Sequence, residues 1–310
     1  MATVYTHIRS NKFKSIVMVV LTMIFALGVG AIFAYAADYG PIAIVLAAVI
    51  GVPMTLTGYF AGDKIALAVN GAKQVQRETN RDLYNVVENI AITAGLPTPK
   101  IYIIPDEAPN AFATGRDPRR ASIALTAGLL RSLDQQELEG VVAHELAHIG
   151  DYDTRYMTIV AVMTGLIVLM SEYFLRFSWI TGGGRRRSSN DSGNAQGIIF
   201  LIGIAIAILA PIVATLTRLA ISRRREALAD AKGAEITRQP ERLADALLKI
   251  SRYDRPARFA NAATSPLYFA DVSKLKGSSF LSRILADHPP VEERVNNLYR
   301  MAGLKSPLES

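Results

Sequence analysis

The residues whose types and spacing could do chemistry are His144, Glu145 and His148, which form the pattern His-Glu-x-x-His. Apolar residues recur at helical spacing through residues 134–150, which predicts one helix there. Residues four apart on a helix lie one above the other, so both imidazoles point to the same side. Two neutral imidazoles on one face can bind a divalent metal ion, while Glu145 reaches toward a water molecule on that ion. The pattern favours a catalytic metal site over a helix that carries two histidines by chance.

The ends of this helix are also marked in the sequence. Asp134 can cap the first turn, and Glu137 completes a capping box three residues later. Gly150 is expected to end the helix. The two histidines therefore lie well inside a helix, which holds their side chains in one direction.

A third metal ligand must come from another part of the chain. The chain has no cysteine, so a zinc ion must take nitrogen and oxygen ligands. A catalytic zinc generally has three protein ligands. Glu226 is the best candidate, because Asp230 follows it on the same face of a predicted helix and can orient a ligand histidine. The alternative, that Glu226 only pairs with the neighbouring arginines, stays open at this point.

The chain is apolar for its length. Of its 310 residues, 50% are hydrophobic and 20% are charged, whereas a soluble protein carries about 25% charged residues. Four long apolar runs lie at residues 15–35, 41–60, 157–174 and 198–220. The first two carry no charge, follow each other closely and are about long enough to cross a bilayer, so they predict a transmembrane hairpin and not a signal peptide. Whether the last two runs fully span the membrane stays open.

The basic residues gather beside the apolar runs. The formal net charge is +7, and lysines and arginines precede the first run and follow the second. This distribution predicts that both ends of the hairpin face the cytoplasm, with the lipid bilayer as a partner. No basic stripe is interleaved with aromatic residues, so nucleic acid is not an expected partner.

These features divide the chain into four parts. We expect a transmembrane hairpin (1–60), the first part of the soluble domain (61–155), a second apolar hairpin (156–220) with a flexible loop (177–197), and the second part of the domain (221–310). In the soluble parts the patterns predict strands at 100–104, 110–114 and 122–126, and helices at 78–94, 240–253 and 287–301. A small sheet packed on the metal-binding helix gives an α+β arrangement that is predominantly helical.

Two further segments are expected to take part in the chemistry. The predicted strand Asn110, Ala111, Phe112, Ala113 and Thr114 suits the edge of a sheet, where an extended substrate peptide can add through main-chain hydrogen bonds. His288, at the start of the last helix, is expected to stabilise the oxyanion. The alternative, that the His-Pro-Pro sequence from His288 only begins a helix, stays open.

Taken in order, these motifs resemble the HtpX-type membrane metalloproteases, which share a superfamily with the CAAX prenyl endopeptidases. The matching segments cover nearly the whole chain. They are the N-terminal apolar hairpin followed by Asp63-Lys64, Asn110-Ala111-Phe112-Ala113-Thr114-Gly115, His144-Glu145-Leu146-Ala147-His148, the second apolar pair, Glu226-Ala227-Leu228-Ala229-Asp230, and His288-Pro289-Pro290 with Glu293-Arg294.

The resemblance implies a gluzincin-like α+β metalloprotease domain with transmembrane helices. It implies one Zn²⁺ per chain, bound by His144, His148 and Glu226, with Glu145 as the general base. It also implies a multi-pass protein of the cell (inner) membrane whose active site faces the cytoplasm. Its protein substrates would be membrane or misfolded proteins, in stress response and protein quality control.

Two other functions also agree with parts of the sequence. A membrane scaffold or transport protein with a structural metal would not need Glu145 and would be expected to supply a fourth ligand. A zinc hydrolase that acts on lipids would share the metal site, but the predicted edge strand suits an extended peptide better.

Overall fold

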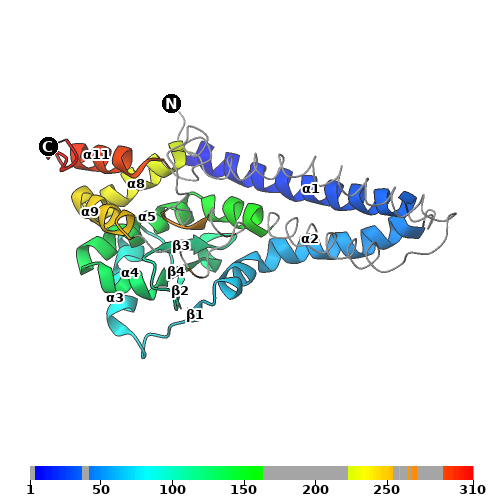
Figure 1. The fold of residues 1–310 in the computed structure, drawn as a ribbon, viewed down its shortest axis with the longest axis horizontal. Helices are drawn as coiled ribbons and strands as arrows, with labels where there is room; N and C mark the ends of the chain where they lie inside the picture. The colour runs from blue at the N-terminus through cyan, green and yellow to red at the C-terminus, as the bar shows by residue number, and fades with distance from the viewer. Residues whose placement is uncertain are drawn as a thin grey trace, which may run out of the picture.

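The computed structural model describes residues 4–36, 42–162, 223–253, 258, 264, 267–270 and 289–309. Two long helices, α1 (Val4–Ala36) and α2 (Ile42–Val69), lie side by side and extend as a hairpin from a domain of shorter helices and a sheet (Figure 1). The apolar run 15–35 falls within α1, and residues 42–60 of the second run fall within α2. Among the described residues, no helix meets both the length and the apolar character that a membrane crossing requires.

Helix α2 continues into the domain. The expected boundary between hairpin and soluble domain at residue 61 falls inside one unbroken helix, which continues to Val69. The buried side chains near its end, Ala66 and Leu67, pack against the sheet and against Met157 and Ala161. The hairpin and the domain therefore share an element.

The domain contains a four-stranded sheet in the order β1-β2-β4-β3. The strands are β1 (Lys73–Gln74), β2 (Lys100–Ile104), β3 (Ala111–Thr114) and β4 (Ser122–Thr126). Strands β2 and β4 run parallel, whereas β3 is antiparallel to β4 and β1 is antiparallel to β2. The three predicted strands are present, and β3 lies at the end of the sheet order, as expected. The short β1 was not predicted because Lys73 and Gln74 carry no apolar alternation.

The sheet is buried on both faces because strand residues alternate in direction. Ile101, Ala113 and Ile123 point into the larger core, which the helices α3 (Arg81–Thr93) and α5 (Gln135–Gly150) complete. Phe112 and Ala124 point the other way, toward the end of α2 and the helical residues 153–162. Such double burial explains why the strands read as nearly continuous apolar runs.

Helix α5 begins as the sequence predicts. The Asp134 side chain accepts a hydrogen bond from the backbone N–H of Glu137 at 2.9 Å, and the Glu137 side chain accepts one from the backbone N–H of Asp134 at 2.8 Å. The end of the helix differs from the prediction. Gly150 is still helical, Asp151 is the C-cap, and the left-handed residue is Tyr152 with φ 60°. The backbone reversal is thus two residues later than expected.

The remaining helices cover α5 and the sheet (Figure 1). They are α4 (Ala127–Ser132), α8 (Arg223–Thr237), α9 (Pro240–Ser251) and α11 (Val291–Met301), and a 3₁₀ turn spans Pro118–Arg120. Helix α11 starts later than predicted, because Pro290 is its N-cap and does not stand inside the first turn. Contacts of α8 and α9 with α5 bring the two parts of the domain together across the intervening sequence.

Candidate metal centre

Three buried side chains converge where α5 and α8 cross. The Nε2 atoms of His144 and His148 lie 3.2 Å apart. The carboxylate of Glu226 lies 3.7 Å from Nε2 of His144 and 3.6 Å from Nε2 of His148. All three side chains are buried. The structure therefore brings the two histidines of α5 and the predicted third ligand to one point.

These separations fit a metal ion in the middle of the three donors. Ligand atoms about 2.1 Å from a tetrahedral metal lie about 3.4 Å from one another. The observed separations of 3.2, 3.6 and 3.7 Å lie close to that value, and the last two are measured to different oxygens of the Glu226 carboxylate, Oε1 and Oε2. Two nitrogens and one carboxylate oxygen form a donor set that suits zinc.

The close approach of the two helices depends on a glycine. A Cβ atom at Gly233 of α8 would lie 3.1 Å from the backbone nitrogen of His144. Any larger residue would push α8 away from α5 and carry Glu226 with it. Glu226 and Asp230 lie one turn apart on α8, so both face the histidines.

Asp230 orients His144 from the side away from the metal position. Its carboxylate lies 2.9 Å from Nδ1 of His144. Arg294 of α11 holds the same carboxylate through two charged hydrogen bonds, from Nε at 2.8 Å and from Nη2 at 2.7 Å. Arg294 also donates to the backbone oxygen of Phe269 at 3.1 Å. A buried bidentate pair of this kind fixes the ring of His144 in one orientation.

His148 is held in the same way by a different acid. Its Nδ1 lies 3.0 Å from the carboxylate of Asp153. The other carboxylate oxygen of Asp153 accepts a hydrogen bond of 2.7 Å from the side chain of Asn11 in α1. The same Asn11 amide donates to the backbone oxygen of Asp151 at 3.0 Å. The first helix of the hairpin is therefore connected to His148, a candidate metal ligand, through the carboxylate of Asp153.

The charges of the site favour a cation between the two imidazoles. Nδ1 of each ring faces a carboxylate, and the two Nε2 atoms face each other only 3.2 Å apart. Burial lowers the pKa of His144 to about 4. Burial also disfavours charge on His148, but its hydrogen bond to Asp153 and the nearby Glu226 raise its pKa to about 9. The pair thus attracts one positive charge, which a metal ion supplies.

Glu145 stands beside this cluster without belonging to it. It is buried, and it is not among the three groups whose ligand atoms converge. Desolvation by burial raises the pKa of Glu145 to about 7, although the charge of His148 and a hydrogen bond from the backbone N–H of Ala113 oppose the shift. A general base works best when its pKa lies near the working pH.

The predicted substrate strand has part of its outer edge covered by the chain itself. The backbone N–H of Phe269 donates to the backbone oxygen of Ala111 at 2.8 Å, and Tyr268 bridges to Phe112. The side chain of Asn110 bonds both backbone groups of Ala270. Asn110, Ala111 and Phe112 therefore hold residues 267–270 in place, and Ala113 is the strand residue that lies against Glu145. His288 lies outside the described residues.

The comparisons with known proteins decide the family. The sequence profile described as "Peptidase family M48" matches residues 77–302. This chain belongs to peptidase family M48.

Relatives of this M48 peptidase match over nearly its whole length. It is 43% identical over 297 residues to a "Protease HtpX homolog" of Caldanaerobacter subterraneus, with 96% of this chain and 97% of that protein covered. It is 42% identical over 302 residues to a "Protease HtpX homolog" of Dictyoglomus thermophilum, with 97% and 95% covered. The family resemblance inferred from the motifs is thus confirmed.

A solved structure shares the fold of this M48 peptidase. The crystal structure of S. mikatae Ste24p matches with a TM-score of 0.51 and 20% identity, over 91% of this chain. The chain spans 65% of the length of Ste24p. This likeness concerns the fold alone, since the identity is low.

Family membership also settles which class of function applies. The chain is a metalloprotease, a hydrolase of peptide bonds. The scaffold and lipid-hydrolase alternatives are therefore set aside.

Three residues that hold the site of this M48 peptidase were not assigned a role from the sequence: Asn11, Asp153 and Arg294. Two of them reach the site through contacts distant in sequence: Asn11 and Asp153 are 142 positions apart, and Arg294 and Asp230 are 64 positions apart. The sequence signals were weak, although Asp153 follows His148 by five residues and Arg294 stands in a motif of the resemblance.

We expect Asn11→Ala to weaken zinc binding by about tenfold, the lower end of the range for groups that act on a metal ligand from behind. The substitution removes the donor that fixes Asp153 and so loosens His148. The measurement is zinc affinity in a competition with a fluorescent chelator. Asn89→Ala, at an exposed position of α3, is the matched control. Equal zinc affinities for Asn11→Ala and the control would mean that Asn11 has no positioning role.

Proposed function

We propose that this M48 peptidase is a zinc-dependent endopeptidase anchored in the cell (inner) membrane, with its active site facing the cytoplasm. Its substrates are membrane or misfolded proteins, and its role is quality control of membrane proteins under stress. The observation that carries the proposal is the convergence of His144, His148 and Glu226 with Glu145 alongside. One zinc ion per chain accounts for the donor set.

The ligand residues and the base would divide the chemistry between them. When bound, zinc would acidify water and polarise the scissile carbonyl. His144, His148 and Glu226 would hold the ion, and Asp230 and Asp153 keep the two rings in place. Three protein ligands are the number that a catalytic zinc site generally supplies.

Glu145 carries the proton through the reaction. Its carboxylate removes a proton from the attacking water as the new C–O bond forms at the scissile carbonyl. The protonated carboxyl then gives that proton to the amide nitrogen as the C–N bond breaks, so the products are a carboxylic acid and an amine. His288 keeps its proposed role in stabilising the oxyanion.

The substrate is proposed to bind as an extended strand beside β3. The first half of the β3 edge already bonds residues 267–270, so we narrow the contact to Ala113 and Thr114. A strand added antiparallel there would place a peptide bond next to Glu145, because the Ala113 backbone already contacts that carboxylate.

A scan of N-methylated substrates tests this binding mode without changing the enzyme. In a β-ladder only alternate residues of the added strand bond to one neighbour. Because the contact is narrowed to Ala113 and Thr114, moving a single N-methyl group along a cleaved peptide should raise KM about tenfold at one position near the scissile bond and leave KM unchanged at the positions on either side of it. Measured KM values without such a position would rule out strand addition.

The proposed membrane anchoring rests on the apolar hairpin. Residues 15–35 and 41–60 carry no charge in the sequence. Apolar side chains on α1 and α2 are exposed, with Phe13 66% and Ile42 65% accessible. Soluble monomers rarely expose long apolar surfaces, so a lipid environment explains them. The basic residues at both ends of the hairpin favour the cytoplasmic side.

Cleavage in reconstituted membranes tests the proposed role. The full chain is placed in lipid nanodiscs with a membrane protein whose cytoplasmic domain has been destabilised by mutation. We expect this domain to be cleaved faster than its folded form, and a zinc chelator to stop the cleavage. Equal cleavage of both forms would contradict a role in quality control, and cleavage unaffected by the chelator would contradict zinc dependence.

A further inference from the structure

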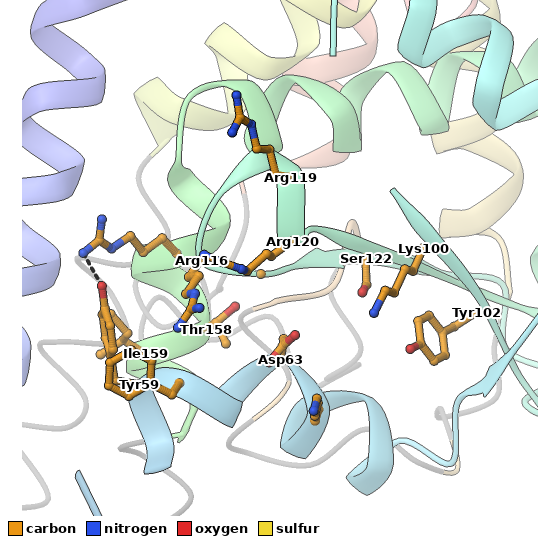
Figure 2. Close-up of a pocket in the computed structure, with 14 residues that line it drawn as sticks. Tyr59, Asp63, Lys100, Tyr102, Arg116, Arg119, Arg120, Ser122, Thr158 and Ile159 are labelled. Atoms are coloured by element: carbon orange, nitrogen blue, oxygen red, sulfur yellow. Dashed lines mark hydrogen bonds between the residues drawn. The ribbon is translucent and has the colours of Figure 1, made fainter. Parts of the chain in front are cut away.

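A second site lies on the face of the sheet away from α5. A cavity of about 310 Å³ is lined by the C-terminal part of α2, the first residues of β2 and β4, the turn after β3 and the helical residues 153–162. Figure 2 shows Tyr59 and Asp63 from α2 on one side, and Lys100, Tyr102 and Ser122 from the strands on the other. The side chains that converge on the metal position do not line it.

The cavity is strongly cationic. Its lining contains one acid, Asp63, and six cations: Lys64, Lys100, Arg116, Arg119, Arg120 and Arg155. Asp117, beside the cavity, pairs with Arg120 at 3.1 Å and with Arg116 at 3.9 Å. Within the described part of the chain, Lys64, Lys100 and Arg119 form no ion pair. Such an excess of positive charge in a partly enclosed space favours an anionic ligand.

Aromatic rings hold two of the arginines at the mouth of the cavity. The guanidinium of Arg116 lies over the ring of Phe60, 5.0 Å from its centre. The guanidinium of Arg155 lies over the ring of Tyr59 at 5.3 Å and also donates to the Tyr59 hydroxyl. Stacked guanidinium groups are well suited to bind phosphate oxygens in pairs.

An apolar stripe on α2 leads to the same cavity. The exposed residues Ile42, Val45, Val49, Leu56 and Phe60 recur at helical spacing on one face of α2. At 1.5 Å per residue this stripe is about 27 Å long, close to the thickness of a bilayer's hydrocarbon core. Phe60 ends the stripe and lines the cavity. A ligand with an anionic head and an apolar tail would match both features.

We propose that this cavity binds the phosphate headgroup of an anionic phospholipid, whose acyl chain lies along the apolar stripe of α2. The proposal rests on the proposed membrane anchoring of the hairpin. The headgroup bridges the C-terminal part of α2 and the Arg116–Arg120 turn that directly follows the substrate strand. Bound lipid thus fixes the catalytic domain at a set height on the cytoplasmic membrane surface.

The test uses the purified full chain in detergent, with lipid binding counted by native mass spectrometry. The probes are dioctanoyl phosphatidylglycerol, dioctanoyl phosphatidylcholine and inorganic phosphate. The site variant is Lys100→Gln/Arg119→Gln, because both side chains are exposed and unpaired among the described residues. Arg81→Gln/Lys305→Gln removes the same charge from exposed positions elsewhere. The thermal unfolding midpoint and the far-UV circular dichroism of each protein show whether the fold is kept.

We expect phosphatidylglycerol to bind the wild type and the control variant equally, and the site variant about 30-fold more weakly, as two basic residues at a membrane surface would give. Phosphatidylcholine should bind more weakly than phosphatidylglycerol. Equal binding of phosphatidylglycerol to the site variant and the control would overturn the site. If inorganic phosphate binds as tightly as phosphatidylglycerol, the lipid assignment is overturned, and the cavity is a site for a free anion.

The outcome is separate from that of the proposed function. Zinc content and peptide hydrolysis of the wild type report on the endopeptidase alone. A wild type that lacks both but discriminates between the lipids would refute the proposed function and keep this site. A wild type that is an active zinc endopeptidase but does not discriminate between the lipids would refute this lipid site and keep the proposed function.

Discussion

Glu145→Gln should lower peptide hydrolysis by about 10²–10⁴-fold or more while the protein keeps its zinc. The range is that of a lost general base, and the loss is larger when the same group also returns the proton to the leaving amine. Glutamine keeps the size of the buried side chain and can still accept the hydrogen bond from the Ala113 N–H. Glu145 is not one of the three converging ligands, so the metal should remain.

Glu139→Gln is the matched control for this variant, because it makes the same change on α5 at a partly exposed position. We expect it to hydrolyse peptide at the wild-type rate. Hydrolysis by Glu145→Gln at that rate, with zinc at full occupancy by elemental analysis, would remove Glu145 from the mechanism.

Glu226→Ala should weaken zinc binding by more than about 100-fold, since losing a ligand costs more than losing a group behind one. The substitution removes one of three donors and leaves Arg294, which lies 4.0 Å from the Glu226 carboxylate, without that neighbouring charge. Both zinc content after dialysis and peptide hydrolysis should fall together. Glu226→Gln keeps the side-chain volume. A loss of zinc in this variant as well would show that the loss in Glu226→Ala comes from the missing ligand and not from a packing defect.

Glu235→Ala provides the comparison on the same helix, because Glu235 is exposed at the opposite end of α8. Its zinc content should equal that of the wild type. If Glu226→Ala and Glu226→Gln both kept wild-type zinc affinity, the third ligand would have to be another residue.

The metal site could be predicted where its chemistry is local. The spacing of His144 and His148 fixes both on one helix face, and the capping box of Asp134 and Glu137 marks where that helix starts. Glu226 could be proposed because Asp230 follows one turn later. In each case the spacing of the residues along one helix determines which side chains share a face, so their relative positions could be predicted from the sequence.

Other parts of the site depend on contacts between residues far apart in the sequence, which no local sequence pattern predicts. Asn11 and Asp153 meet only because α1 packs beside the end of α5. Arg294 reaches Asp230 from a helix 64 residues away. The cover over the β3 edge comes from residues 267–270, where the sequence predicted no strand. Such contacts follow from the tertiary packing of whole elements, so single-sequence periodicity could not predict them.

The sheet also has some features that the sequence predicts and others that it does not. Alternation and β-branched residues predicted β2, β3 and β4, but not that β2 and β4 would run parallel with Ile101 opposite Ile123. The turn after β3 was expected at Gly115, whose φ is 128° and whose Cβ would lie 2.6 Å from the backbone oxygen of Arg120. Turn residues therefore located the strand ends, while the strand order required the packing of α2 and α5 on the two faces.

The central claim is that one zinc ion, held by His144, His148 and Glu226, makes this chain a peptidase. The most direct measurement is a zinc titration of the chelator-treated full chain, with bound zinc and peptide hydrolysis measured on the same samples. We predict that hydrolysis is absent without metal, rises in proportion to bound zinc and stops rising at one zinc per chain. Full hydrolysis in the zinc-free protein, or hydrolysis that does not follow bound zinc, would contradict the claim.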